Sequence, residues 1–525
     1  MSRDSFIHPR TAELLFYLPE LKFDHADHPP DIALSWECYE FSANILATAL
    51  SQKCSQRSIK EYLQRFPREE VSRSLEHYVN GPRIMTYAVD TGNTEIVQLL
   101  HEYNGNANSE DFEDNVPLLA FAIMRATRNG HTSLEMVKLL LSYGADPLAI
   151  PKEMWKNYVK TPIATKYDRD NILDSERWCV DEYRLILAKS LDLTTRYYLW
   201  RASRLGKPAR RMLQITAALK MTALLRLPFR IIGQELTVKL VIDTVYTHMA
   251  QDTEKPLVVA FAGASGHGKT ELATQMGSLL SIQNINIDCT HINSHMALFG
   301  STFGYESNAN GAPLNNFLVD NQGKRCVVFL DEFDKTDYDT RNALLKVMDD
   351  GTYRDRRGES DHAELDCRRV IWILATNLGN DAISRFHSQY LIKCSNDEDR
   401  ANISIEPLQN ELEELYMSRF SPAVTGRIDE IAPFFPFDKG EQAVVAHKFL
   451  LKFIDEVRCP IDEGTNRLVG HTNIRVIEDG KVCEEIARKW YKERLGARSI
   501  YKGVRTLRRK FILKYVDMDG LVRKR

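Results

Sequence analysis

Eight residues in the middle of the chain read Gly263-Ala264-Ser265-Gly266-His267-Gly268-Lys269-Thr270. The apolar run 257–262 precedes them, and the helix-favouring run 271–276 follows. A strand, a glycine-rich turn and a helix start form the context of a phosphate-binding loop, or P-loop. In such a loop the glycines let successive backbone N–H groups point at phosphate oxygens, and the helix N-terminus adds a partial positive charge. We therefore expect a nucleotide site here rather than an ordinary tight turn.

All eight residues are candidate ligands of ATP, together with Glu271 in the first turn of the helix. Lys269 is expected to reach the β- and γ-phosphates, and the Thr270 hydroxyl to bind Mg²⁺. The run 326–330 predicts a buried parallel strand that ends in two carboxylates, Asp331 and Glu332. We expect Asp331 to hold Mg²⁺ opposite Thr270, and Glu332 to polarise the attacking water as a general base.

Three further polar residues follow at the ends of elements. A third predicted strand, 370–376, ends at Asn377. The Asn377 amide can orient water near the γ-phosphate, or it can simply cap the strand; the residues alone leave both open. Arg427 comes later in Gly426-Arg427-Ile428-Asp429-Glu430, and Arg498 in Gly496-Ala497-Arg498. A guanidinium suits phosphate oxygens through its planar fork, and an arginine supplied by a neighbouring subunit can stabilise charge in a transition state.

Composition and charge exclude several classes of protein. A chain of 525 residues is too long for one core and suggests roughly two to four domains. The net charge of -3 gives no global field that would attract nucleic acid. No apolar run approaches the ~18 residues of a membrane span. Nine singly scattered cysteines, and an N-terminus that fits neither a secretory signal nor a mitochondrial presequence, favour the cytoplasm.

Two segments of the first half, 85–100 and 117–147, echo each other. Each predicts two short antiparallel helices with a small residue, Ala88 or Ala122, where they meet, as in a stacked solenoid. The sequences of 130–141 and 143–147 resemble ankyrin repeats. Proteins of the ankyrin-repeat family typically bind other proteins on a concave face. At least three units are normally needed to close a core, so we expect degenerate copies around 43–66 and 161–193. Two clear copies also leave an unrelated helical bundle open.

The second half resembles a single AAA+ module of the Clp/Hsp100 chaperone family, closest to the second ATPase ring of the ClpB-type disaggregases. The matching sequence motifs occur in the family's order, at 232–234, 268–273, 329–335, 347–351, 376–379, 427–430 and 496–498. The resemblance implies a hexameric ring in which Asn377 is sensor 1, Arg427 the arginine finger that acts on a neighbour, and Arg498 sensor 2. It also implies that Ile232 lies near the adenine.

The resemblance extends to a substrate-gripping pore loop. The stretch 300–305 matches that loop and implies that Tyr305 lies in the central channel, where an aromatic ring can grip polypeptide of any sequence. The alternative is a turn tyrosine packed on its own domain. The sequence departs from the family at 306–308, where a second Gly-Tyr is usual, and at His267, where a small apolar residue is usual.

We expect a multidomain chain in which an all-α ankyrin-like solenoid precedes an α/β P-loop AAA+ domain and a small helical lid. The expected bounds are 1–35 for an irregular lead-in, 36–200 for the solenoid, 201–230 for a basic connecting helix, 231–435 for the P-loop domain and 436–525 for the lid. This arrangement is similar to that of Skd3-type disaggregases.

The function that this arrangement predicts is ATP-dependent remodelling of proteins. An ATP-hydrolysing homo-hexamer would thread unfolded or aggregated proteins, and the repeats would recruit a protein partner. The rival from another class is a nucleotide-switched scaffold that threads nothing. A motor acting on nucleic acid is a more distant alternative, supported only by basic runs at 201–230 and 501–525. A solvated basic face is the simpler interpretation of the first run.

Overall fold

The computed structural model describes the chain in two compact units. The repeat unit comprises residues 1–207 and 450–483, and the P-loop unit comprises residues 208–449 and 484–525. The structure describes residues 18, 21, 40–112, 114–129, 134–164, 176–205, 210–219, 221–251, 255–292, 294–300, 312–355, 364–393, 403–462, 464 and 467–522. Most of the lead-in expected at 1–35 lies outside these residues, and the domain bounds given above remain predictions.

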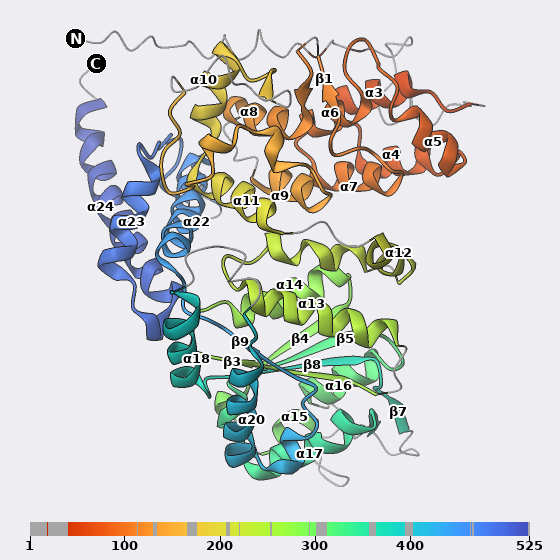
Figure 1. The fold of residues 1–525 in the computed structure, drawn as a ribbon, viewed down its shortest axis with the longest axis vertical. Helices are drawn as coiled ribbons and strands as arrows, with labels where there is room; N and C mark the ends of the chain where they lie inside the picture. The colour runs from red at the N-terminus through yellow and green to blue at the C-terminus, as the bar shows by residue number, and fades with distance from the viewer. Residues whose placement is uncertain are drawn as a thin grey trace. The chain divides into compact units, whose positions relative to one another are not determined.

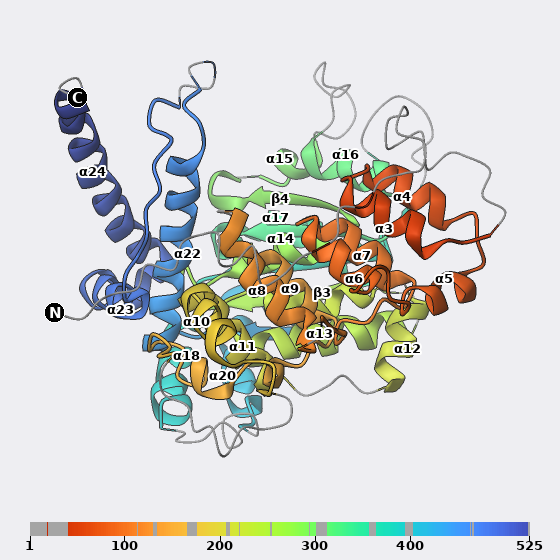
Figure 2. The same ribbon diagram turned by 90° about the horizontal axis from the view of Figure 1, so that it is seen from above.

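Four helix pairs form a stack in the repeat unit (Figures 1 and 2). The first helices of the pairs pack on one another in chain order, and so do the second helices. This nearest-neighbour stacking confirms the predicted solenoid and sets aside the unrelated bundle. The pairs are α3 (Ala43–Ser51) with α4 (Gln56–Leu63), α6 (Ile84–Asp90) with α7 (Thr94–Glu102), α8 (Leu118–Asn129) with α9 (Leu134–Ser142), and α10 (Asp181–Ser190) with α11 (Leu193–Arg204).

Short side chains and caps define these helices. Ala88 and Ala122 are fully buried, which allows the close approach that α6 and α8 make. The Asn93 side chain accepts the Glu95 N–H at 2.9 Å and so begins α7, as N-cap residues do. Shorter elements link the pairs: α5 (Arg68–Ser74), β1 (Glu110–Asp111), β2 (Val116–Pro117), η1 (Pro147–Ala149) and η2 (Lys152–Met154).

A buried ion pair ties the segment 450–483 into the repeat unit. Arg196 on α11 donates to both Asp479 carboxylate oxygens, at 2.8 and 3.3 Å, and to the carbonyls of Tyr158 and Leu191. Asp479, the first residue of α23 (Asp479–Trp490), also accepts the Leu193 N–H at 2.6 Å. Arg196 is 1 % exposed. The helices α22 (Lys439–Arg458) and α23 each run from one unit into the other.

The basic run 201–230 differs from the single solvated helix that its charges predict. It comprises the end of α11, the helix α12 (Arg210–Ala218) and the 3-10 segment η5 (Thr222–Phe229). Arg201 is 1 % exposed, and its guanidinium donates to the Tyr197 hydroxyl at 2.7 Å. Burial beside an aromatic hydroxyl is a role that a charge count does not reveal. Pro228 lies within η5, where it is compatible with 3-10 geometry but not with a continuous α-helix.

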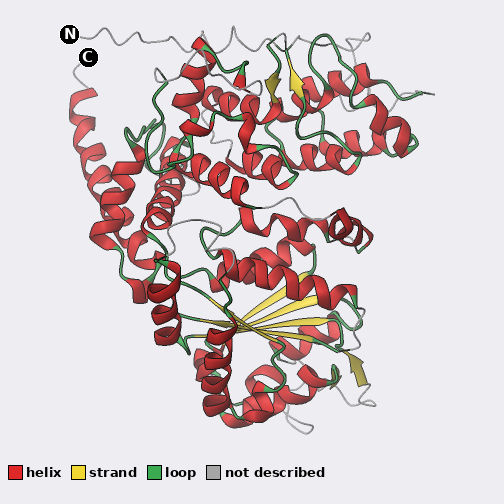
Figure 3. Cartoon of the chain, viewed as in Figure 1, coloured by secondary structure: helices red, strands yellow, loops and turns green. Residues whose placement is uncertain are grey.

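A five-stranded parallel sheet forms the centre of the P-loop unit (Figures 1 and 3). Its three central strands are buried on both faces, as parallel strands covered by helices are, whereas the edge strand Gln283–Asp288 is largely exposed. The order across the sheet places β8 between the strand that leads into the P-loop and the strand that ends in Asp331. That order is β4 (Gln283–Asp288), β5 (Cys326–Asp331), β8 (Val370–Thr376), β3 (Leu257–Ala262) and β9 (Glu430–Pro433).

The alternation of strand side chains divides the core into two layers. Val259, Phe261 and Ile373 face one layer with α13 (Glu235–Ala250), α14 (Lys269–Leu280) and η5. Val258, Val328 and Trp372 face the other. The second layer is completed by α15 (Met296–Phe299), α16 (Pro313–Asp320), α17 (Tyr338–Asp349), α18 (Asn380–Phe386) and α20 (Glu406–Phe420).

The strand register brings the ends of β3, β5 and β8 to one edge of the sheet. Ala262 pairs with Thr376, and Leu330 pairs with Leu374. Ligands of open parallel sheets bind at this carboxyl edge. The unit also contains η6 (Cys289–His291), η8 (Phe333–Lys335), β6 (Thr352–Arg354), β7 (Glu364–Asp366), the π-helical turn η9 (His387–Leu391), α21 (Pro422–Thr425), η11 (Glu493–Leu495) and α24 (Ala497–Val522). Within the described ranges, no helix is long and apolar enough to cross a membrane.

Candidate active site

The predicted P-loop is a tight turn between β3 and α14. Gly266 has a φ of 81°, and a Cβ atom there would lie 2.3 Å from the Leu495 carbonyl oxygen. Gly263 has a φ of 131°, and its Cβ would lie 2.7 Å from the Phe434 carbonyl oxygen. Only glycine fits both the backbone conformation and the space at these two positions. The loop is therefore a cradle that side chains would fill.

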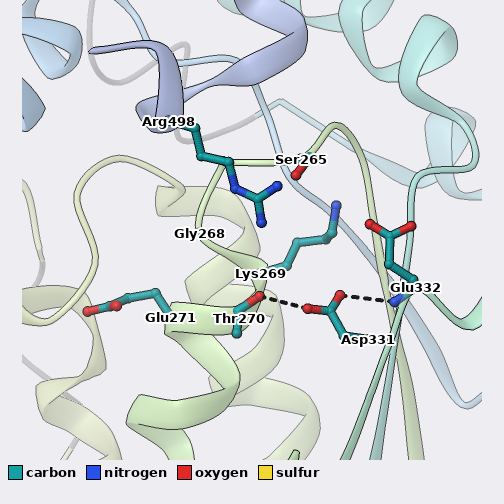
Figure 4. A pocket seen from close by; sticks show the side chains of 9 residues that line it. Ser265, Gly268, Lys269, Thr270, Glu271, Asp331, Glu332 and Arg498 are labelled. Carbon is teal, nitrogen blue, oxygen red and sulfur yellow. Dashed lines mark hydrogen bonds between the residues drawn. The ribbon is translucent and has the colours of Figure 1, made fainter. Parts of the chain in front are cut away.

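A pocket opens above this cradle, at the carboxyl edge of the sheet (Figure 4). Its volume is about 170 Å³, which is less than the roughly 300–1,000 Å³ of pockets that enclose a whole small-molecule ligand. The pocket therefore matches the phosphate end of a nucleotide. Its lining comprises Ser265, Gly266, Gly268, Lys269, Thr270, Glu271, Asp331, Glu332 and Arg498.

Lys269 lies deep in this pocket. Its ammonium donates to the carbonyls of Gly263 and Ala264 and to Oδ1 of Asn377. Burial lowers the pKa of Lys269 to about 8, although the neighbouring carboxylates Asp331 and Glu332 act in the opposite direction. The cation is therefore held close to the point where it can lose its proton, and a phosphate beside it would restore its preference for charge.

Hard oxygen donors lie next to Lys269. The Thr270 hydroxyl donates to Asp331 Oδ2 at 3.2 Å, and the Glu332 N–H donates to Asp331 Oδ1 at 3.0 Å (Figure 4). A hydroxyl and a carboxylate in contact are the oxygen ligands that Mg²⁺ takes beside substrate phosphates. The donor set that the sequence assigned to Mg²⁺ therefore fits this ion in chemistry and in position.

Asn377 joins the catalytic candidate to the P-loop lysine. Its Nδ2 donates to Glu332 Oε2 at 2.8 Å, while its Oδ1 accepts from Lys269 at 3.2 Å. Its backbone N–H donates to Asp334 at 3.3 Å. Glu332 itself has a left-handed backbone with a φ of 53°, which directs its carboxylate away from the end of β5 and into the pocket. Asn377 is thus a side-chain bridge and not only a strand cap.

Arg498 reaches the pocket from the second residue of α24. Its guanidinium points toward the P-loop in Figure 4. The preceding residue fixes the approach, because the Ala497 N–H donates to the Gly266 carbonyl at 2.8 Å. The start of α24 is therefore hydrogen-bonded to the loop that it faces.

Comparisons with known proteins agree with this geometry. Residues 254–431 match the family model of the AAA domain (Cdc48 subfamily), and residues 46–150 match that of ankyrin repeats, with three copies. The ClpB chaperone of Staphylococcus epidermidis is 28% identical over 284 residues, which cover 52% of this chain and 29% of that protein. The chain therefore contains an AAA domain and N-terminal ankyrin repeats, and part of it is similar to ClpB chaperones.

Other similar proteins cover different shares of the chain. The mitochondrial ClpB4 of Arabidopsis thaliana is 30% identical over 221 residues, which cover 40% of this chain and 22% of that protein. A solved structure of Hsp104 with ATPγS and casein has a TM-score of 0.44 and 19% identity, and the likeness covers 82% of this chain and 65% of that chain. The match spans less than a third of the length of each of the two ClpB proteins.

Several predicted site residues lie outside the pocket lining or point away from it, and His267, Gly263 and Ala264 of the P-loop itself are among those outside the lining. Arg427, between α21 and β9, pairs with Asp349 at 3.0 Å and is not among the lining residues. Ile232 is buried but is also not among them. Glu271 contributes to the lining, but its carboxylate points away from Asp331 and Glu332 and pairs with Lys448 at 3.5 Å. Tyr305 lies outside the described residues.

The sequence analysis missed two residues that shape the site. Asp334 is 6 % exposed, accepts the Asn377 N–H and acts electrostatically on Lys269. Its position three residues after Asp331 is the only signal that could have found it. Gln234 has a left-handed backbone, and its side-chain amide bonds to both the N–H and the carbonyl of Phe435, at 2.9 and 2.8 Å. Gln234 lies in the matching motif 232–234, but that motif did not predict this role.

Proposed function

We propose that this AAA+ ATPase couples ATP hydrolysis to the remodelling of unfolded or aggregated proteins. The observation that carries the ATPase part is the convergence of Lys269, Thr270, Asp331, Glu332 and Arg498 on one phosphate-sized pocket. The remodelling part rests on the ClpB relatives, which share the ATPase domain, and on the ankyrin repeats. Hydrolysis needs a cradle for phosphate, a positioned base and charge stabilisation, and each has a candidate in this set.

Each residue of the pocket has a proposed role in binding. The N–H groups of the P-loop and the start of α14 receive the phosphate oxygens, and Lys269 pairs with the β- and γ-phosphates. Thr270 and Asp331 would hold Mg²⁺, which neutralises charge that develops on the phosphate oxygens. The adenine would lie beyond this pocket near Ile232, because the pocket volume suffices for phosphates alone.

Glu332 is the proposed general base. Its carboxylate accepts the proton of the attacking water while the water oxygen bonds to the γ-phosphorus and the bond to the β-phosphate oxygen breaks. Asn377 donates to Oε2 of Glu332 and leaves Oε1 available to the water. Arg498 would stabilise the charge on the γ-phosphoryl group, since it lines the same pocket.

Arg427 supports the proposal of a ring. Within its own subunit it pairs with Asp349 and stays outside the pocket lining. An arginine on that surface can reach the nucleotide of a neighbouring copy, as an arginine finger does. We therefore propose a homo-hexamer in which Arg427 completes the next subunit's site. Threading through the central channel, with Tyr305 as the gripping side chain, belongs to the same proposal.

The experiment that tests this function is ATP-dependent recovery of an aggregated model enzyme. The wild-type chain is expected to restore activity with ATP, and Glu332→Gln is expected to bind ATP without restoring activity. Tyr305→Ala should retain ATP hydrolysis and lose recovery. Normal turnover by Glu332→Gln would refute the assignment of the base. ATP turnover without any recovery would instead favour the rival function. In that function the chain is a scaffold whose assembly is controlled by nucleotide and whose repeats bind a partner.

The compartment is a separate proposal. We propose the cytoplasm, because Cys179, Cys289, Cys326, Cys367, Cys459 and Cys483 form no disulfide in the structure. Burial raises the pKa of the Cys179 and Cys289 thiols to about 12, so these side chains stay protonated and unreactive at neutral pH. The similar ClpB4 of Arabidopsis thaliana is mitochondrial, which makes an organelle the alternative. Microscopy of the tagged full-length chain in its source cells tests the proposal, and an organellar signal would refute it.

A further inference from the structure

We propose that His267 is a positioning residue that seats the start of α24, and with it Arg498, against the P-loop. The inference rests on the proposed ATP hydrolysis and adds a residue to its machinery. His267 belongs to the P-loop but is absent from the lining of the phosphate pocket. Its ring points elsewhere, into contacts with the C-terminal part of the P-loop unit.

The His267 ring is buried and contacts one aromatic ring and two polar groups. It is 1 % exposed and lies stacked on the Phe437 ring, with centroids 5.3 Å apart and an interplanar angle of 27°. Its Nδ1 lies 3.3 Å from the Ala264 carbonyl oxygen, and its Nε2 lies 3.4 Å from the Tyr491 hydroxyl. Phe437 precedes α22, and Tyr491 directly follows α23. One side chain therefore contacts both ends of the segment that leads to Arg498.

The partners determine which nitrogen carries the proton. The Ala264 carbonyl can only accept, so Nδ1 is the donor, and Nε2 accepts from Tyr491. The Phe437 backbone also hydrogen-bonds to the Tyr491 hydroxyl, which leaves the hydroxyl proton available to His267. Burial lowers the pKa of His267 to about 4, so the ring is neutral at pH 7, as this arrangement requires.

The backbone beside His267 also connects the P-loop to the start of α24. Gly266 accepts the Ala497 N–H at 2.8 Å, and a Cβ atom at Gly496 would lie 2.4 Å from the Gly266 oxygen and 3.1 Å from His267 Cε1. The contact is therefore too close for any residue but glycine at 496. A small apolar side chain at 267 could fill space here, but it could not hydrogen-bond to Tyr491. The imidazole adds a directional link to Tyr491, seven residues before Arg498.

The expected consequence is a loss of turnover that depends on Arg498. In His267→Ala, we expect kcat for ATP to fall about tenfold, the effect of losing one or two buried hydrogen bonds, and KM to change less than threefold. In an Arg498→Ala background, the same substitution should reduce kcat by less than twofold. Tyr491→Phe keeps both rings and removes one hydroxyl, so it should show a smaller, likewise Arg498-dependent loss.

Two controls separate this inference from the proposed function. Wild-type turnover and its loss in Glu332→Gln test ATP hydrolysis by itself. Hydrogen exchange of the peptide that spans 493–500 tests the contact between the start of α24 and the P-loop without any turnover. The Ala497 amide should exchange at least fivefold faster in His267→Ala. Equal kcat losses with and without Arg498, or unchanged exchange in this peptide, would overturn the proposal. If His267→Ala does not fold, Tyr491→Phe provides both readouts.

Discussion

Removal of the Asp479 carboxylate should loosen the repeat unit by a large and localised amount. In the wild-type chain this group receives two hydrogen bonds from Arg196, one from the Leu193 N–H and one from the Gly480 N–H. Asp479→Ala leaves the Arg196 guanidinium with the carbonyls of Tyr158 and Leu191 and with no counter-ion. Breaking a buried pair in this way costs about 3–5 kcal/mol, because a charge remains buried and uncompensated.

That free energy converts to an exchange rate. At 1.4 kcal/mol per tenfold, 3–5 kcal/mol corresponds to roughly two to three and a half powers of ten in the opening equilibrium of α11. Hydrogen exchange with mass spectrometry on the full-length chain measures this opening directly in the 193–204 peptide. The matched control is Glu485→Ala on the same helix, α23. Its pair with Arg488 is exposed, with side chains 60 % and 76 % accessible, and should leave α11 unchanged.

A second variant distinguishes the charge penalty from lost packing. In Arg196→Met with Asp479→Leu, both charges are replaced by apolar groups of similar size, and most of the protection of α11 should return. Gly480→Ala should disturb the packing next to Asp479 by a steric clash, since its Cβ would lie 1.7 Å from the Val159 carbonyl oxygen. An acceleration below tenfold in Asp479→Ala would refute the reasoning, as would a double variant no better protected than the single one.

Four further outcomes follow from the pocket. Lys269→Ala should abolish ATP binding in equilibrium dialysis, and measurable affinity within tenfold of wild type would contradict its role. Because burial lowers the pKa of Lys269 to about 8, the affinity for ATP should fall as pH rises from 7 to 9, when the uncharged amine stops attracting phosphate. Lys269→Arg should remove that pH dependence, and its persistence would point to another group. Arg427→Ala should retain ATP binding and lose turnover; full turnover would argue against a site shared between subunits.

The fold of the ATPase part was predictable because its signals are local. The unbroken apolar composition and the length of 257–262 and 326–330 identify buried strands, and the glycine spacing after the first strand is typical of a phosphate-binding loop. The ends of these strands then had to meet, because parallel strands present their carboxyl ends at one edge. Lys269, Thr270, Asp331 and Glu332 therefore lie together as predicted.

Contacts between distant residues were not predictable from such patterns. Arg196 and Asp479 are 283 residues apart, and neither lies in a motif that specifies a partner. The basic run that contains Arg201 predicts a solvated face, yet Arg201 is buried against the Tyr197 hydroxyl. The roles of Asp334 and Gln234 likewise depend on groups that only the tertiary structure brings near. A run of charged residues describes only the composition of a segment. Whether one of its side chains is buried depends on which other parts of the chain pack over it.

The amide at position 377 illustrates how the site's chemistry selects a residue type. Its two ends face opposite demands: Oδ1 must accept from the Lys269 ammonium, and Nδ2 must donate to the Glu332 carboxylate. An aspartate would place a second anion 2.8 Å from Glu332, and a lysine would repel Lys269. A neutral donor and acceptor satisfies both neighbours without changing the charge of either. Since a bound phosphate would compete for Lys269, the same amide links phosphate binding to the orientation of the base, which a strand cap alone could not do.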